Sequence, residues 1–414
     1  MLITCCFALW GFANDITNPM VKSFSKIFRM SVTEGALVQV AFYGGYFCMA
    51  LPAALFIRRF SYKSGILMGL GLYAAGALLF LPAAKIGSYW PFLVAYFILT
   101  CGLSFLETTA NPYILSMGAK ETATRRLNFA QSFNPIGSLC GMFVAMNLIQ
   151  ARMNPLSTAE RALLDEASFE AVKAGDLGVV VGPYAGIGVV LVAFFVAIWR
   201  WVGPSTGPST GSGTDSGSVF KRLLKNKAYR GGVVAQFFYL GAQITCWTFI
   251  IQYGTQVFMA EGMEEQAAEI LSQRMNIVAM VLFCCSRFIC TALMKRFRPA
   301  GMLAVFAAAA IGLSLVVVFA GGRVGLYSLV AVSACMSLMF PTIYGLALKD
   351  VGADAEIGSA GLIMAILGGS LLPPVQALII DQGRVAFSFI VPLICFVVVL
   401  TYGLKCIKLK VNES

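Results

Sequence analysis

Histidine is missing from this chain, and charged residues are scarce. None of the 414 residues is His, and Asp, Glu, Lys and Arg together make up 12% of them. A zinc or haem site therefore has few possible ligands, and a hydrolase would lack the usual base for its nucleophile. Soluble domains carry about 25% charged residues, so most of the surface of this protein must face lipid. The sequence indicates a membrane protein that is not an enzyme and that binds no cofactor.

The cysteines and the basic balance have plain explanations. There are 12 Cys and no C-x-x-C pair, and most of them lie within apolar runs, as expected of small buried residues. The net charge of +11 can signal a nucleic-acid partner. Here Lys and Arg stand in the gaps between apolar runs. The positive charge is therefore explained by the loops of a membrane protein, and we expect no nucleic-acid partner.

Apolar runs of membrane-spanning length recur along the chain, since a spanning helix needs about 20 apolar residues. Charge-free runs cover 35–57, 64–84, 127–151, 177–199, 231–260, 301–320, 324–348, 357–380 and 385–404. Three more runs, 1–21, 91–115 and 275–294, each contain one charged residue near their middle or end. We therefore predict an all-α membrane protein with twelve transmembrane helices.

The hydrophilic segments predict two halves. A Gly/Ser/Pro-rich stretch over 203–218 follows six predicted helices and precedes six more. Short basic loops at 58–65 and 295–301 occupy matching places in both halves, which favours a duplicated six-helix unit. The predicted organisation is an N-terminal half over 1–202, a cytoplasmic linker over 203–229 and a C-terminal half over 230–414. The excess of basic residues on the linker side places both termini in the cytoplasm.

An acid stands in the first predicted span. Asp15 shares a helical face with Asn18, and Pro19 frees backbone carbonyls nearby, which suits a helix that lines a cavity. A carboxylate inside the bilayer costs about 2.5–3.5 kcal/mol and is a functional-site hypothesis by default. The alternative is a structural polar contact between helices.

The fourth predicted span repeats this pattern. Glu107 and Asn111 are one turn apart, and Pro112 follows. The alternative is a helix end at the membrane surface, but the long uncharged run before Glu107 favours a deep position. A buried acid can hold a proton and release it when a water path opens. Without His, proton coupling would use Asp15, Glu107 or both, although carboxylate and amide oxygens also bind sodium.

Amides and aromatic residues inside the spans predict a neutral, hydroxyl-rich solute. Amides donate and accept hydrogen bonds, and aromatic faces pack on the apolar faces of sugar rings. Polar residues that join helices are the alternative. The candidate substrate-binding residues are Trp10, Asn14, Asn18, Asn111, Gln131, Asn134, Tyr239, Gln243 and Trp247. Arg287 is the one base within a span, where it either faces a cavity or reaches the inner surface, and we expect a structural role for it.

Five segments carry a resemblance to a known family. FALWGFANDITNPM, FLETTANPY, RRLNFAQSFNPIGS, FYLGAQITCW and SLMFPTIYGLALKDVG together resemble the L-fucose:proton symporters of the major facilitator superfamily. The similarity covers nearly all of the chain. It implies the major facilitator fold, alternating access by rocking of the halves, and a place in a bacterial inner membrane.

The resemblance also implies residue roles. The acid of the ETxANP motif matches Glu107 and takes part in proton coupling, and Gln131 and Asn134 match amides that help to bind sugar. One position departs from the family, because Asn18 stands where its first-helix acid commonly falls. Asp15 is one turn earlier on the same face, so we expect it to take over that role.

The resulting hypothesis is a monomeric secondary transporter that imports L-fucose with protons. A glucose, galactose or other neutral hexose transporter, coupled to protons or sodium, is the alternative. A sugar sensor and an efflux pump remain further alternatives. An added soluble domain would favour the sensor, and a more apolar cavity with fewer amides would favour the efflux pump.

Overall fold

The computed structural model is helical and contains no strand in the residues that it describes, which are 2–17, 20–30, 34, 37–156, 158–200, 216–380 and 382–411. Eleven helices in this part of the chain are long and apolar enough to cross a membrane. They coincide with the second to twelfth predicted spans. The first predicted span contains α1 (Leu2–Thr17), a helix of 16 residues, and α2 (Met20–Ile27) follows it. The predicted all-α membrane fold is confirmed.

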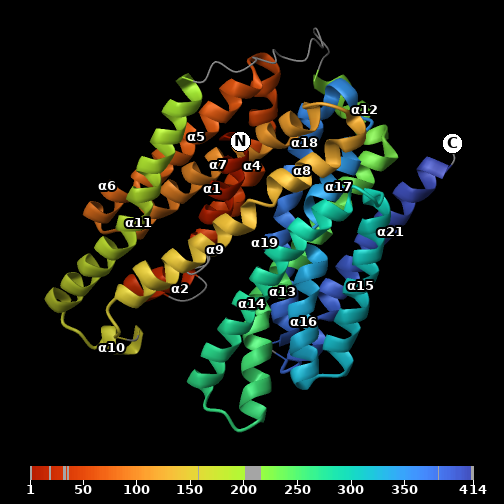
Figure 1. Cartoon of the computed structure of the whole chain (residues 1–414). Coiled ribbons are helices and arrows are strands. Elements are labelled where there is room, and N and C mark those ends of the chain that lie inside the picture. Colours follow the sequence, from red (N-terminus) through yellow and green to blue (C-terminus); the bar gives the residue numbers. More distant parts are fainter. Residues whose placement is uncertain are drawn as a thin grey trace. The chain divides into compact units, whose positions relative to one another are not determined.

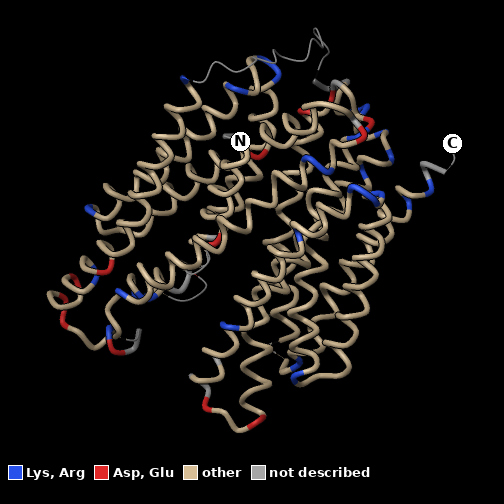
Figure 2. Tube along the Cα trace, viewed as in Figure 1, with Lys and Arg blue, Asp and Glu red and all other residues tan. Residues whose placement is uncertain are grey.

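The long helices carry little charge in their middle lengths. Figure 2 shows Lys, Arg, Asp and Glu gathered mainly near helix ends and in the connections between helices. Exposed large apolar side chains line many helices, among them Val94, Val189 and Leu378. This distribution fits helices that are surrounded by hydrocarbon.

The chain forms two compact units, each a bundle of helices (Figure 1). Unit 1 consists of Met1–Asn111 and Ile136–Ser212, and unit 2 of Pro112–Pro135 and Gly213–Ser414. The segment 112–135 belongs by chain order to the predicted N-terminal half and yet groups with unit 2. The predicted division at 203–229 stays a prediction, and residues 203–215 lie outside the described part.

Unit 1 holds the first group of helices. Besides α1 and α2 it contains α4 (Leu37–Arg59), α5 (Tyr62–Leu78), α6 (Phe80–Ile86), most of α7 (Tyr89–Ser116), nearly all of α9 (Asn134–Val144), the π-helical turn η2 (Ala145–Ile149), η3 (Gln150–Arg152), α10 (Thr158–Ala162) and α11 (Glu166–Arg200).

Unit 2 holds the remaining helices. They are η1 (Lys120–Thr122), α8 (Ala123–Gln131), α12 (Ser216–Lys225), α13 (Lys227–Ala260), α14 (Glu265–Leu293), α15 (Pro299–Phe319), α16 (Gly322–Met336), α17 (Met339–Ala347), η4 (Gly352–Asp354), α18 (Ala355–Met364), η5 (Ala365–Leu367), α19 (Gly368–Ile380), α20 (Val385–Ser388) and α21 (Ile390–Val411).

Glycines allow α5 and α7 to pack closely in unit 1. A Cβ atom at Gly76 would lie 2.3 Å from the backbone N of Leu99, and one at Gly102 would lie 2.3 Å from the backbone N of Tyr73. Neither position accepts a larger residue without moving a helix, because the clashing atoms belong to backbone. Close approach through small residues is a common way for helices to associate in lipid.

A glycine also fixes α1 against α9. A Cβ atom at Gly137 would lie 1.7 Å from the carbonyl oxygen of Ala8, so the two backbones are in direct contact there. The Ser138 hydroxyl, one residue on, donates to the carbonyl oxygen of Gly11 at 3.4 Å. The helix that carries Asp15 therefore has a rigid support.

Several predicted spans consist of more than one helix, among them the fifth and the tenth. The fifth consists of α8 and α9 with a break at 132–133, and the tenth consists of α16 and α17 with a break at 337–338. Pro135 and Pro341 follow these breaks within the first turn of α9 and α17. Proline has no N–H and crowds the carbonyl of the residue four positions earlier, so it ends the preceding helix.

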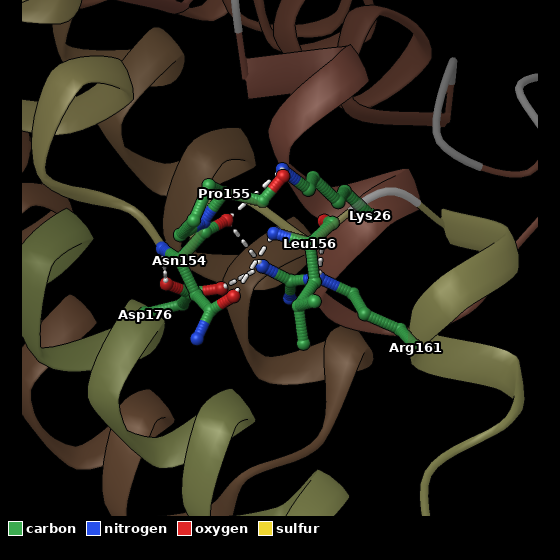
Figure 3. A network of polar contacts seen from close by, with 6 residues as sticks. All are labelled: Lys26, Asn154, Pro155, Leu156, Arg161 and Asp176. Carbon is green, nitrogen blue, oxygen red and sulfur yellow. Dashed lines mark hydrogen bonds and ion pairs between the residues drawn. The ribbon is translucent and has the colours of Figure 1, made fainter.

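A buried ion pair fastens the loop before α11 (Figure 3). The Nη2 atom of Arg161 lies 2.6 Å from the Oδ2 atom of Asp176, and both side chains are buried. The backbone N–H of Asn154 donates to Asp176 at 2.7 Å, and its carbonyl accepts from Lys26 of α2 at 3.0 Å. The network joins α2, α10 and α11 within unit 1.

Candidate functional site

Asp15 of α1 is buried in unit 1, with a relative exposure of 9%. Its carboxyl lies within electrostatic range of the Tyr43 hydroxyl on α4. Asn14 is half-buried beside it, whereas Asn18 lies outside the described residues. Of the four positions of the first predicted span that the sequence singles out, Trp10, Asn14 and Asp15 lie within the described residues and Asn18 does not.

Glu107 is buried well inside α7, with a relative exposure of 3%. The neighbouring polar side chains Thr108 and Asn111 are fully buried as well. Neither carboxyl oxygen of Glu107 accepts a hydrogen bond of normal geometry from a described residue, and the Asn111 amide one turn on is the side chain that bears on it most. An ionised carboxylate in such a place is costly, because few polar groups replace the water that it has lost.

Aromatic side chains stand beside the two acids. Tyr46 of α4 lies within electrostatic range of Glu107, and its hydroxyl accepts a hydrogen bond from the indole N–H of Trp10. The Ser104 hydroxyl of α7 donates to the backbone carbonyl of Tyr46 at 3.1 Å. Unit 1 therefore brings Trp10 and Glu107 to one cluster through Tyr46, which the sequence analysis did not single out.

The predicted aromatic residues of unit 2 lie on α13 and face α16. Tyr239 is fully buried and donates its hydroxyl to the carbonyl of Met336 at 3.0 Å, so this hydroxyl is engaged with the backbone. Trp247 is half-buried, and its indole N–H donates to the Ser333 hydroxyl at 3.2 Å. Gln243 is buried between them along the helix.

The predicted amides of the fifth span lie at its break. Gln131 is the last residue of α8 and is fully buried, and Asn134 is the first residue of α9 and is half-buried. A break suits a binding site, because irregular backbone within a membrane occurs where it lines a cavity or is buried in protein.

Arg287 is the residue whose contacts sequence reasoning missed. It is 3% exposed, so it does not reach the inner surface. Its Nε atom donates to the carbonyl of Ser337 at 2.5 Å, and Nη1 donates to the carbonyl of Gln131 at 3.1 Å. The signal in the sequence was a single base in the eighth span together with a proline in the fifth and in the tenth.

The described part of the chain offers no group of three His, Cys, Asp or Glu side chains placed to hold a metal ion. The chemistry that the arrangement can perform is proton binding on Asp15 or Glu107 and hydrogen bonding through the amides and indoles.

A family model identifies the fold. Residues 3–373 match the Major Facilitator Superfamily. The chain belongs to this superfamily. It is therefore a multi-pass membrane transporter and not an enzyme.

Known members of the superfamily cover the chain from end to end. An L-fucose-proton symporter of Haemophilus influenzae is 50% identical over 99% of this chain and 96% of that protein. One of Escherichia coli is 36% identical over 97% of this chain and 91% of that protein. A crystal structure of the transporter FucP in the outward conformation matches with a TM-score of 0.88 and 33% identity, over 98% of this chain and 97% of that chain. Within the superfamily, this chain belongs to the L-fucose:proton symporter family.

Proposed function

We propose that this protein imports L-fucose together with protons by alternating access. The observation that carries the proposal is the 50% identity, over 99% of the chain, to a protein named L-fucose-proton symporter. The two buried acids of unit 1 and the buried amides of unit 2 support it, because they supply proton carriers and hydroxyl-binding groups without a cluster of fixed charge.

The transport cycle begins with protonation. In the outward-open state a proton binds to Asp15 or Glu107, and the sugar then binds to amides and aromatic rings. The neutral, loaded protein closes and reopens inward, because enclosing an uncharged site costs less than enclosing a carboxylate. One inward charge is worth about 2.3 kcal/mol per 100 mV, enough for roughly fifty-fold accumulation of a neutral sugar.

The proposed setting is the inner membrane of a bacterium, with both termini in the cytoplasm and the protein acting as a monomer. The proton is the proposed coupling ion. The buried and poorly hydrogen-bonded carboxyl of Glu107 supports this choice, because a neutral acid needs fewer partners than a carboxylate.

The test is uptake of labelled sugar into proteoliposomes. An inward proton gradient is expected to drive accumulation of L-fucose more strongly than of D-glucose or D-galactose, and a sodium gradient alone is expected to drive none. Preference for glucose or galactose would overturn the proposed substrate. Uptake that follows sodium rather than pH would overturn the proposed ion.

A further inference from the structure

Arg287 carries a buried charge in the membrane without an acid beside it. Among the described residues no carboxylate lies within ion-pairing distance of its guanidinium, which instead sits over the ring of Phe283 at 4.6 Å from the centroid. A buried cation is costly unless it is hydrogen-bonded. The guanidinium must therefore be stabilised by hydrogen-bond acceptors other than a carboxylate.

Two prolines leave backbone carbonyls that can serve as these acceptors. Proline cannot donate to the carbonyl four residues earlier in a helix. For Pro135 that carbonyl belongs to Gln131, and for Pro341 it belongs to Ser337. These are the two carbonyls to which Arg287 donates, at 3.1 Å and 2.5 Å. One guanidinium thus replaces the backbone donors missing at both helix breaks, and the C-terminal ends of α8 and α16 favour a positive charge there.

Predicted sugar-binding residues meet at the same place in unit 2. Gln131 bears one of the two carbonyls, and Tyr239 donates to Met336, the residue next to Ser337. The Trp247 ring packs edge-on against Phe283 with centroids 5.0 Å apart, and Phe283 is the ring under Arg287. Arg287 therefore contacts Gln131 itself, the residue next to the hydrogen-bond partner of Tyr239, and the ring that packs on Trp247.

We propose that Arg287 is a positioning residue of the sugar site, which it builds by holding the breaks of α8 and α16 together so that the Gln131 side chain is set for the sugar. The proposal rests on the proposed function as a sugar transporter. The role needs arginine, because its planar fork reaches two carbonyls at once, whereas the ammonium of lysine is a single point.

The test is a double-mutant cycle on binding, measured by calorimetry on the purified full chain. The wild type is first titrated with L-fucose, D-galactose and D-glucose, and the sugar that binds most tightly is used throughout. Arg287→Lys and Gln131→Ala are each expected to raise the Kd about tenfold. Because Arg287 acts through Gln131, the double variant is expected to be no weaker than the weaker single variant.

Arg126→Lys is the matched control. Arg126 also donates to backbone carbonyls in unit 2, those of Ala119 and Leu115, and shares neither of them with Arg287. We expect its Kd to equal that of the wild type. If Arg287→Lys does not fold, Phe283→Leu replaces it in the cycle, with an expected Kd increase of about threefold and the same lack of additivity.

Three results would decide against these ideas. A Kd unchanged in Arg287→Lys, with only the fraction of binding-competent protein reduced, would make the residue merely structural. Fully additive losses in the cycle would show that it does not act through Gln131. Failure of the wild type to bind any of the three sugars would instead overturn the proposed function, and the inference with it. Tight binding of a hexose other than fucose leaves the cycle valid and corrects only the substrate.

Discussion

The carboxyl of Glu107 is enclosed by uncharged side chains of α7 and α4, so its protonation changes the charge of a buried region by a full unit. Asp15 is the second acid of unit 1 and lies near Tyr43 instead. The two acids have different neighbours and can be separated experimentally. Asp15 also stands one turn before the position where the family commonly has its acid.

Replacing Glu107 by Gln keeps its shape and removes the exchangeable proton. We expect Glu107→Gln to lose accumulation of L-fucose driven by a pH gradient. Exchange of labelled for unlabelled sugar should continue, because exchange requires no net movement of protons. Both are measured in the same proteoliposomes. Accumulation that survives the change would remove Glu107 from the coupling role.

Asp15→Asn tests the shifted acid separately. If Asp15 has taken over the family's first-helix role, this variant should also lose pH-driven accumulation. Glu170→Gln is the control for both acids, because Glu170 is an exposed residue of α11 that pairs with Lys173. Normal transport by Asp15→Asn would show that the displaced acid is not the functional counterpart.

At the scale of helices, the network around Arg161 and Asp176 stabilises the loop after η3. Removing one member of a buried ion pair leaves an uncompensated charge and costs about 3–5 kcal/mol. Arg161→Met is expected to lower the unfolding temperature strongly, and the double variant Arg161→Met/Asp176→Leu to recover part of the loss. A thiol-reactive dye follows the unfolding, since Cys6, Cys101 and other free cysteines are buried.

Arg323→Met is the comparison for this experiment. Arg323 pairs with Glu261 at 2.7 Å, but both side chains are substantially exposed, so little stability should be lost. An Arg161→Met protein as stable as the wild type would mean that the loop does not depend on the network.

Hydropathy located the spans of the described part, because each must bury a length of helix set by the bilayer. It did not locate the breaks in the fifth and tenth spans, since an uncharged apolar run carries no information on the loss of individual backbone hydrogen bonds. Pro135 and Pro341 were visible signals for both. What supplies the missing donors could not be predicted, because Arg287 is distant in sequence from Gln131 and meets it only through packing.

The candidate site was predictable to a similar degree. An acid within an apolar run is expensive, so the burial of Asp15 and Glu107 followed from the sequence. Tyr46 gave no such signal, since a tyrosine in an apolar run is unremarkable until its neighbours are known. Tyr239 was predicted as a sugar contact, whereas the structure engages its hydroxyl with a backbone carbonyl.

At the scale of the whole molecule, the packing of α8 predicts contacts that must break during transport. It belongs to the predicted N-terminal half, yet it packs within unit 2, where a Cβ atom at Gly345 of α17 would lie 3.2 Å from the Cβ of Thr124. The Asn128 amide also donates to the Thr342 hydroxyl at 3.3 Å. If the predicted halves rock against each other, these contacts must break once in every cycle.

A disulfide across this contact tests the requirement. The Cβ atoms of a disulfide bond are about 3.5–4.5 Å apart, so a disulfide here requires the two Cβ atoms to separate by a few tenths of an ångström from 3.2 Å. Oxidised Thr124→Cys/Gly345→Cys is expected to lose uptake and to regain it on reduction, with sugar binding preserved throughout. Each single variant under the same oxidant controls for the native cysteines. Full uptake by the crosslinked protein would show that α8 and α17 never separate.

The placement of the tryptophans gives the molecule a built-in optical reporter. Trp90 and Trp199 stand at the ends of α7 and α11 and are 68% and 62% exposed, where aromatic residues meet the lipid interface. Trp10 and Trp247 are hydrogen-bonded within their units, and Trp201 lies outside the described residues. Brominated lipids would quench the emission of the two exposed indoles. Among the described indoles, the light that remains would come from Trp10, whose partner Tyr46 lies near Glu107, and from Trp247, which packs on the Phe283 ring under Arg287. Sugar and proton binding could then be followed without attaching a dye.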